Sequence, residues 1–177
     1  MRWVFLLKQE TPLSSDPTFY DFVPYKYGPF SFTVYRDLEE LARFGYLNGD
    51  GLRLQADLTS AAQGHFLSLA GDLRQEVMGV LARYGRLSQA RLVHSIYEKY
   101  PWFASRSELN GAPKSTAKQR FAAYTAGYEG ESIEAFLQKL LKAGIDRIVD
   151  VRNNPVSRKY GFSKGTLDSL CTNLDIR

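Results

Sequence analysis

The sequence predicts an α+β protein, with a helical, winged-helix-like N-terminal domain followed by a partial α/β domain that contains parallel strands. Apolar residues recur at helical spacing through the N-terminal half, and the turn signal Asn48–Gly51 interrupts them. After residue 120, a strand-like, a helical and a second strand-like segment follow one another, which is the order of a βαβ unit. We therefore expect a winged-helix-like domain over 1–105, a basic linker over 106–120, and an incomplete α/β domain over 121–177.

The composition is that of a folded protein from a reducing compartment. Of 177 residues, 44% are hydrophobic and 24% are charged, which suits one large domain or two small ones. No apolar run is long enough to cross a bilayer, and the opening segment lacks the cleavage site of a signal peptide. The single cysteine, Cys171, excludes an internal disulfide. These features predict a cytoplasmic protein without membrane contact.

The positive charge is concentrated in one stretch of the chain. The net charge is +4, yet residues 1–103 hold 11 basic and 11 acidic residues. Residues 104–120 hold four basic residues and one acid, and they lack apolar periodicity. This composition predicts the linker. A basic linker is either solvated, which is the commoner case, or in contact with phosphates.

Four helices and one hairpin are predicted in the N-terminal domain. Apolar side chains share a helical face in four segments: 2–8, 31–44, 69–81 and 88–100. The aromatic segment around Pro24 and Gly28-Pro29 is extended, because proline interrupts a helix. A helix, then Gly45, then a hairpin over Tyr46–Leu54 is the order of a winged helix.

The charge of the predicted recognition helix argues against simple DNA binding. It carries three acids against two arginines: Asp37, Glu39 and Glu40 against Arg36 and Arg43. Acids repel the phosphates that such a helix must approach, so a protein contact through the aromatic segment 18–35 stays open. The segment "FVPYKYGPFSFTVYRDLEEL" also resembles the Panacea-type domains associated with antitoxins. That resemblance implies a bacterial or phage-defence setting and a protein partner.

The C-terminal segment predicts strands over 121–130 and 145–152, joined by an amphipathic helix. Ser132 is the expected N-cap of this helix and Gly144 its C-terminal stop. Another helix is expected from Thr166 to Leu174. Two parallel strands make a poor sheet by themselves, so we expect the domain to be incomplete or to borrow structure from a partner, a homodimer included.

The segment "DVRNNPVSRKYGF", residues 150–162, predicts a ligand site. Ligands of open α/β sheets bind at the carboxyl ends of the strands, and both predicted strands end in polar residues. Asp150 is the candidate catalytic acid or base and Arg152 the candidate anion clamp. The other predicted ligand-binding residues are Tyr128, Glu129, Asn153, Arg158, Lys159 and Lys164. The alternative is that Asp150 and Arg152 only pair with each other, and that Asn153-Asn154-Pro155 is only a turn.

Residues 121–177 closely resemble the opening of a bacterial family of unknown function catalogued as four-eight-eight. The matching features are Gly127–Gly130, Ile133–Leu141, Asp150-Val151-Arg152, Pro155, Ser157, Phe162 and Leu167. The resemblance implies an α/β fold and a polar site around Asp150 and Arg152. It implies no settled reaction, and family members continue with further strands and helices.

Other kinds of site find no support in the sequence. Phosphate-binding glycine motifs are missing, and His65, His94 and Cys171 lack metal spacing. We therefore expect neither a cofactor nor a metal, and we expect Cys171 to be a packed thiol. The first functional hypothesis is nucleic-acid processing or binding of a nucleotide-like ligand. The alternative is a non-enzymatic regulator or defence component that acts through protein contacts of the N-terminal domain, and the sequence leaves open whether the protein is an enzyme.

Overall fold

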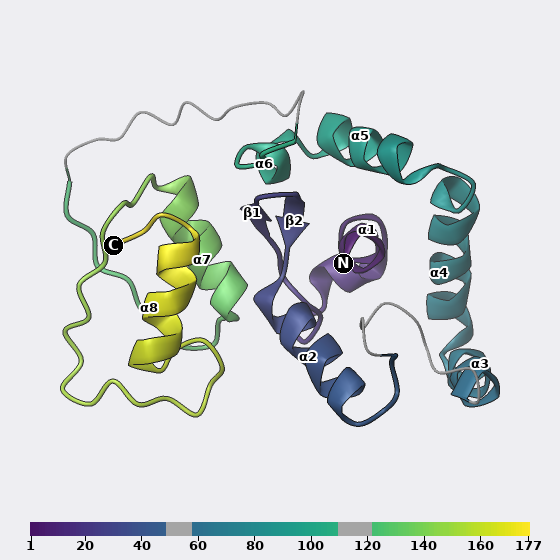
Figure 1. Ribbon diagram of the computed structural model, residues 1–177, viewed down its shortest axis with the longest axis horizontal. Helices are drawn as coiled ribbons and strands as arrows, with labels where there is room; N and C mark the ends of the chain where they lie inside the picture. The colour runs from purple at the N-terminus through teal and green to yellow at the C-terminus, as the bar shows by residue number, and fades with distance from the viewer. Residues whose placement is uncertain (49–57, 110–121) are drawn as a thin grey trace. The chain divides into compact units, whose positions relative to one another are not determined.

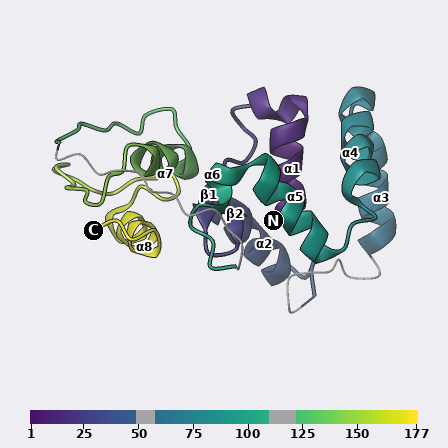
Figure 2. The same cartoon turned by 90° about the horizontal axis from the view of Figure 1, so that it is seen from above.

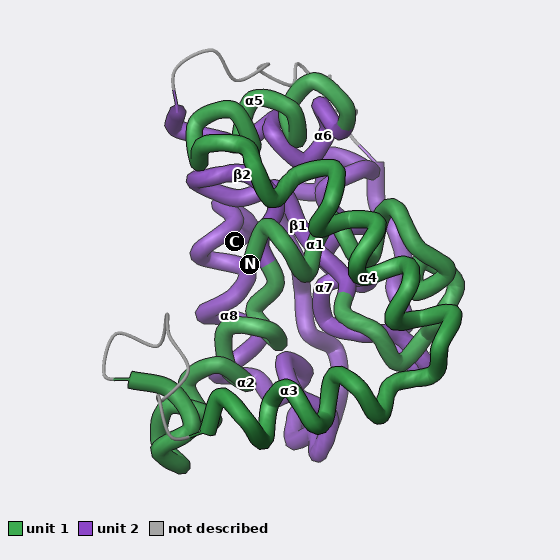
Figure 3. Tube along the Cα trace, turned by 90° about the vertical axis from the view of Figure 1, so that its right-hand side faces the viewer, with its two compact units in different colours: residues 1–20, 31–99 green, residues 21–30, 100–177 purple. Residues whose placement is uncertain are grey.

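The computed structural model describes residues 1–48, 58–109 and 122–177, which are mostly helical and include one small sheet (Figure 1). The predicted α+β class is confirmed at this level. Two compact units divide the chain: Met1–Tyr20 with Ser31–Lys99, and Asp21–Phe30 with Tyr100–Arg177 (Figure 3). The hairpin expected at Tyr46–Leu54 lies largely outside the described residues, and the winged helix is not confirmed.

The first unit is helical. Its elements are α1 (Arg2–Glu10), the 3-10 turn η1 (Pro12–Ser15), α2 (Phe32–Arg43), α3 (Thr59–Ser68), α4 (Gly71–Tyr84) and α5 (Gln89–Lys99). The four helices that periodicity predicted are confirmed as α1, α2, α4 and α5. The helix α3 was not predicted, because its few large apolar residues form no stripe and none of its side chains is buried.

A buried carboxylate joins three helices of the first unit. The Glu10 side chain, at the end of α1, is only 3% exposed. It accepts hydrogen bonds from the Tyr84 hydroxyl at 2.5 Å and from Lys99 Nζ at 2.7 Å, and Arg83 Nη1 lies 3.0 Å away. These partners come from α4 and α5. Such a network is needed because a buried carboxylate without cations is costly.

The only sheet in the described residues is a short hairpin in the second unit. Strand β1 (Val23–Tyr25) pairs antiparallel with β2 (Gly28–Phe30), in the register Val23↔Phe30. Gly28 has φ of 98°, a left-handed conformation that glycine adopts without strain. The short helix α6 (Pro101–Ala104) packs against both strands. The aromatic segment is therefore extended, as predicted, and it forms the sheet itself.

Two helices dominate the rest of the second unit. They are α7 (Ile133–Lys142) and α8 (Lys164–Asn173), which lie side by side in Figures 1 and 2. Both were predicted, as was the Ser132 cap, whose hydroxyl accepts the Ala135 N–H at 3.0 Å. Between them they bury Phe136, Leu137, Leu140, Leu167, Leu170 and Cys171.

The segments predicted as parallel strands flank α7, and within the described residues neither forms a strand. One pair of backbone hydrogen bonds has parallel geometry. The Ile148 N–H donates to the Arg177 carbonyl at 2.7 Å, and the Arg177 N–H donates to the Asp146 carbonyl at 2.9 Å. This is the hydrogen-bond pattern of a single parallel bridge between Arg147 and Arg177. A single bridge is not a ladder, so the parallel βαβ unit is not confirmed and stays a prediction.

Candidate functional site

The centre of the candidate site is the guanidinium of Arg152. Its Nε and Nη2 donate to the two carboxylate oxygens of Asp150, at 2.8 and 2.6 Å. Its Nη1 donates to the Phe162 carbonyl at 2.8 Å and to the Tyr128 hydroxyl at 3.3 Å. Arginine has five N–H groups, and these four contacts leave one for any ligand. Arg152 is therefore held in place mainly by the protein itself.

An aromatic stack supports this arginine. The Tyr128 ring lies parallel to the buried Phe162 ring, with centroids 4.3 Å apart, and the Arg152 guanidinium lies 5.3 Å from the Tyr128 centroid. Phe162 in turn meets Phe136 of α7 edge to face at 5.5 Å. The stack thus packs the segment before α7 and the loop before α8 against each other and against Phe136 of α7.

The loop can reach this position because residue 161 is glycine. Gly161 has φ of 89°, and a Cβ placed there would lie 2.4 Å from Cγ1 of Ile133. Any larger residue would therefore push the loop away from α7. The role of Phe162 was not predicted as part of the site, although Phe162 and Ile133 are both among the residues that carry the family resemblance.

The loop between Pro155 and α8 is closed by its own hydrogen bonds. The Ser163 hydroxyl donates to the Ser157 carbonyl at 2.9 Å, and the Lys164 N–H donates to the Pro155 carbonyl at 3.0 Å. Three exposed cations project from this closed loop: Arg158, Lys159 and Lys164. We call these three residues the basic loop. None of them forms an ion pair with a carboxylate in the part of the chain that the structure describes.

The electrostatics of the site keep Asp150 ionised. Hydrogen bonds from the Arg152 side chain lower the pKa of Asp150 to about 2, and the Arg152 backbone N–H and the positive charges of Arg152 and Lys164 act in the same direction. The same side-chain bond raises the pKa of Arg152. At neutral pH Asp150 is therefore a weak base, and its main action is to orient Arg152.

The structure brings only part of the predicted site together. Tyr128, Asp150 and Arg152 form one cluster, whereas Glu129 and Asn153 are exposed and have no hydrogen bond to it within the described ranges. The side chain of Asn154 instead accepts the Val156 N–H at 3.3 Å, as in a turn.

The other chemically notable residues lie outside this cluster. Cys171 is buried in α8, and burial raises the pKa of its thiol to about 11, which confirms the predicted packed thiol. Across residues 1–48, 58–109 and 122–177, no three His, Cys, Asp or Glu side chains are grouped so that they could hold a metal ion. In the same ranges, no helix combines the length and the apolar character needed to cross a bilayer.

Residues 132–177 match the model of the family described as Domain of unknown function DUF488. The match runs from the Ser132 cap through α7, Asp150 and Arg152 to α8, and it confirms the resemblance that the sequence indicated for this segment. The DUF488 segment thus contains every member of the Arg152 cluster except Tyr128. No curated protein and no solved structure matches the chain.

Proposed function

We propose that the DUF488 segment binds a phosphate-bearing ligand, a nucleotide or a nucleic acid, at the basic loop. The observation that carries this proposal is the contrast between Arg152, which the protein itself engages, and the three exposed cations of the basic loop. The closed loop limits the backbone freedom that is lost on binding, and exposed cations without a carboxylate partner suit phosphate recognition.

Arg152 and Asp150 have a supporting role in this proposal. The bond from Arg152 to the Phe162 carbonyl fixes the end of the loop that carries Lys159 and Lys164. Lys159 Nζ stands 5.7 Å from the Phe162 centroid, so its position depends on the same stack. The function that the geometry supports is therefore binding, with Arg152 as a positioning residue and the basic loop as the contact surface.

The test is a charge-reversal variant, Lys159→Glu with Lys164→Glu. We expect it to bind a fluorescein-labelled oligodeoxythymidine more weakly in anisotropy titrations. The slope of log affinity against log salt should also fall in size, by about 0.7 for each phosphate contact that is lost. ATP as a competitor tests whether a single nucleotide is enough. The matched control is Arg91→Glu with Arg86→Glu, which changes the net charge equally on the first unit.

Equal weakening by the control pair would show that net charge alone governs binding, and that the basic loop has no special role. Exposed apolar side chains support the protein-partner alternative: Leu41, Phe44 and Tyr46, in and after α2, are 42%, 66% and 49% exposed. Apolar groups in such positions favour a protein contact. An interaction of the full chain that is insensitive to salt and to the basic-loop variant would support that alternative.

A further inference from the structure

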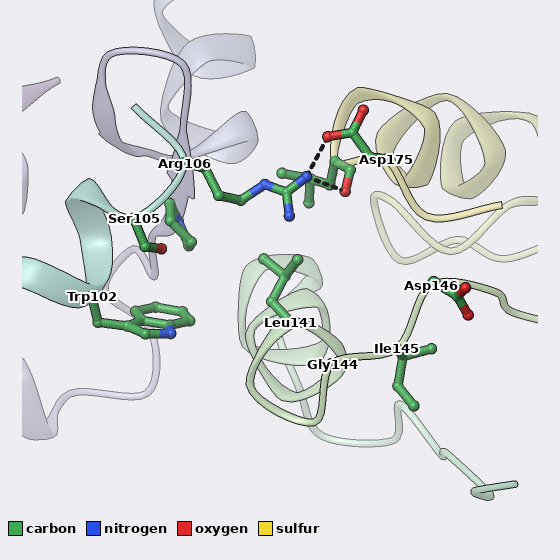
Figure 4. A pocket seen from close by; sticks show the side chains of 10 residues that line it. Trp102, Ser105, Arg106, Leu141, Gly144, Ile145, Asp146 and Asp175 are labelled. Atoms are coloured by element: carbon green, nitrogen blue, oxygen red, sulfur yellow. Dashed lines mark hydrogen bonds and ion pairs between the residues drawn. The ribbon is translucent and has the colours of Figure 1, made fainter. Parts of the chain in front are cut away.

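A cavity of about 360 Å³ lies in the second unit, and none of its lining residues belongs to the Arg152 cluster (Figure 4). Its walls come from β1, from α6 and the two residues after it, from the C-terminal end of α7 and the residues that follow it, and from the residues after α8. The lining residues that matter below are Trp102, Arg106, Leu141, Ile145, Asp146 and Asp175. This volume is at the lower end of the range for small-molecule sites, so it suits a compact ligand.

Arg106 presents unused donors to this cavity. Its Nη2 donates to the Leu174 carbonyl at 2.7 Å and to Asp175 at 2.5 Å, which holds the side chain in place. Its Nε and Nη1 have no partner among the described residues. Figure 4 shows the guanidinium held at Asp175 and extending over Leu141. Because Nη2 is engaged, the free N–H groups on Nε and Nη1 point to opposite sides of the guanidinium. Nη1 can still donate one charge-assisted hydrogen bond to an oxyanion in the cavity.

One wall of this mainly polar cavity is suited to a flat apolar group. The Trp102 indole faces Leu141 across the opening in Figure 4, and Ile145 lies beyond Leu141. Lys142 Nζ lies over the Trp102 ring, 4.8 Å from its centroid, which adds positive charge at one face of the ring. An aromatic ring placed against Trp102 would bury apolar surface on both partners.

Two carboxylates at the rim set the charge balance. Asp175 is 89% exposed and already pairs with Arg106, and Asp146 lies 3.8 Å from Arg177. Neither is therefore an isolated acid that would require a cation. Asp175 instead competes with an incoming anion for the same guanidinium. From this arrangement we infer that the cavity binds an aromatic carboxylate, with one of its oxygens on Nη1 of Arg106 and its ring against Trp102.

The test uses the full chain with Trp3→Phe, which leaves Trp102 as the single tryptophan. Titration with benzoate should give a saturable change in Trp102 fluorescence. Benzamide, which has the ring without the charge, and acetate, which has the charge without the ring, should each bind at least about tenfold more weakly. Benzamide or acetate binding as tightly as benzoate, or a benzoate titration without saturation, would overturn the inference.

Two variants in this background act in opposite directions. Arg106→Gln should weaken benzoate binding about tenfold or more, because the charged donor is lost. Asp175→Asn should tighten it, because the competing carboxylate is removed, and asparagine tolerates the φ of 53° at this position. If Arg106→Gln unfolds the protein, Asp175→Asn decides alone, and unchanged or weaker binding contradicts the inference. The pair Lys159→Glu with Lys164→Glu should leave benzoate binding unchanged, which separates this cavity from the basic loop.

Discussion

At the scale of single residues, the pair Asp150 and Arg152 could be predicted only in part. The two-residue spacing placed both side chains on one face of extended chain, and their mutual pairing was one of the two interpretations left open. The bond to the Phe162 carbonyl was not predictable. It depends on how ten residues of loop fold back, and that path depends on a left-handed Gly161 packed against Ile133.

Because the pKa of Asp150 is lowered to about 2, its charge should stabilise the fold in a defined pH range. An unfolded aspartate titrates near pH 4, so the contribution is present above about pH 4 and is lost as the pH falls toward 2. We expect the melting temperature of the wild type to fall more steeply over this range than that of Asp150→Asn. Thermal melts monitored by circular dichroism at stepwise lower pH measure this, and two parallel curves would contradict the prediction.

At the scale of elements, helices were predicted better than strands, because the periodic spacing of apolar residues within a helix indicates which of its faces is buried. The stripe on α7 and the cap at Ser132 are local signals, and both are confirmed. The hairpin of β1 and β2 has only three residues in each strand. Two of the six are prolines, Pro24 and Pro29, which in the sequence indicate only that a helix is interrupted. The hairpin is stabilised by its contacts with α6 and α7, and the local sequence of the hairpin does not indicate these contacts.

The start of α7 is an element that also joins distant parts of the chain. The Ser132 hydroxyl caps the helix and donates to Asp21 at 2.6 Å. We expect Ser132→Ala to lower the free energy of unfolding by about 1–2 kcal/mol, since the cap and the second bond are both lost. Chemical denaturation measures the change.

A double-mutant cycle with Asp21→Ala separates the two contributions. The part of the Ser132→Ala effect that disappears in the Asp21→Ala background belongs to the link, and the rest belongs to the cap. Ser88→Ala is the control, because the Ser88 hydroxyl lies 3.4 Å from the Arg91 nitrogen at the exposed start of α5, and its effect should be smaller. An effect at Ser88 as large as that at Ser132 would contradict this account.

At the scale of the whole molecule, the second unit is assembled from pieces far apart in the sequence. Residues 21–30 belong to it together with Tyr100–Arg177. Besides the Ser132 bond, the Gln138 amide donates to the Phe22 carbonyl at 2.8 Å. The change of charge and composition near residue 105 predicts a domain boundary there, and that boundary stays a prediction. Composition does not indicate that residues 21–30 pack against α7, which lies more than 100 residues later in the chain.

We therefore expect the backbone amides of α7 to be less protected from hydrogen exchange in a fragment of residues 106–177 than in the full chain. The fragment lacks Asp21, Phe22 and the whole of α6, which contact or approach α7 in the complete protein. Hydrogen exchange followed by mass spectrometry should show faster exchange in α7 of the fragment than in α7 of the intact chain. Equal protection in both would show that the DUF488 segment folds independently of residues 21–30.

The same long-range bonds have a consequence during synthesis on the ribosome. Asp21 and Phe22 are separated from their partners Ser132 and Gln138 by 111 and 116 residues. At typical elongation rates of about 5–20 residues per second, the nascent hairpin waits on the order of 5–20 s for α7 to be made. Throughout that interval Phe22 and Val23, both buried in the finished protein, lack the helix that covers them. We therefore expect the newly emerged segment to be accessible to chaperones that capture exposed apolar chain.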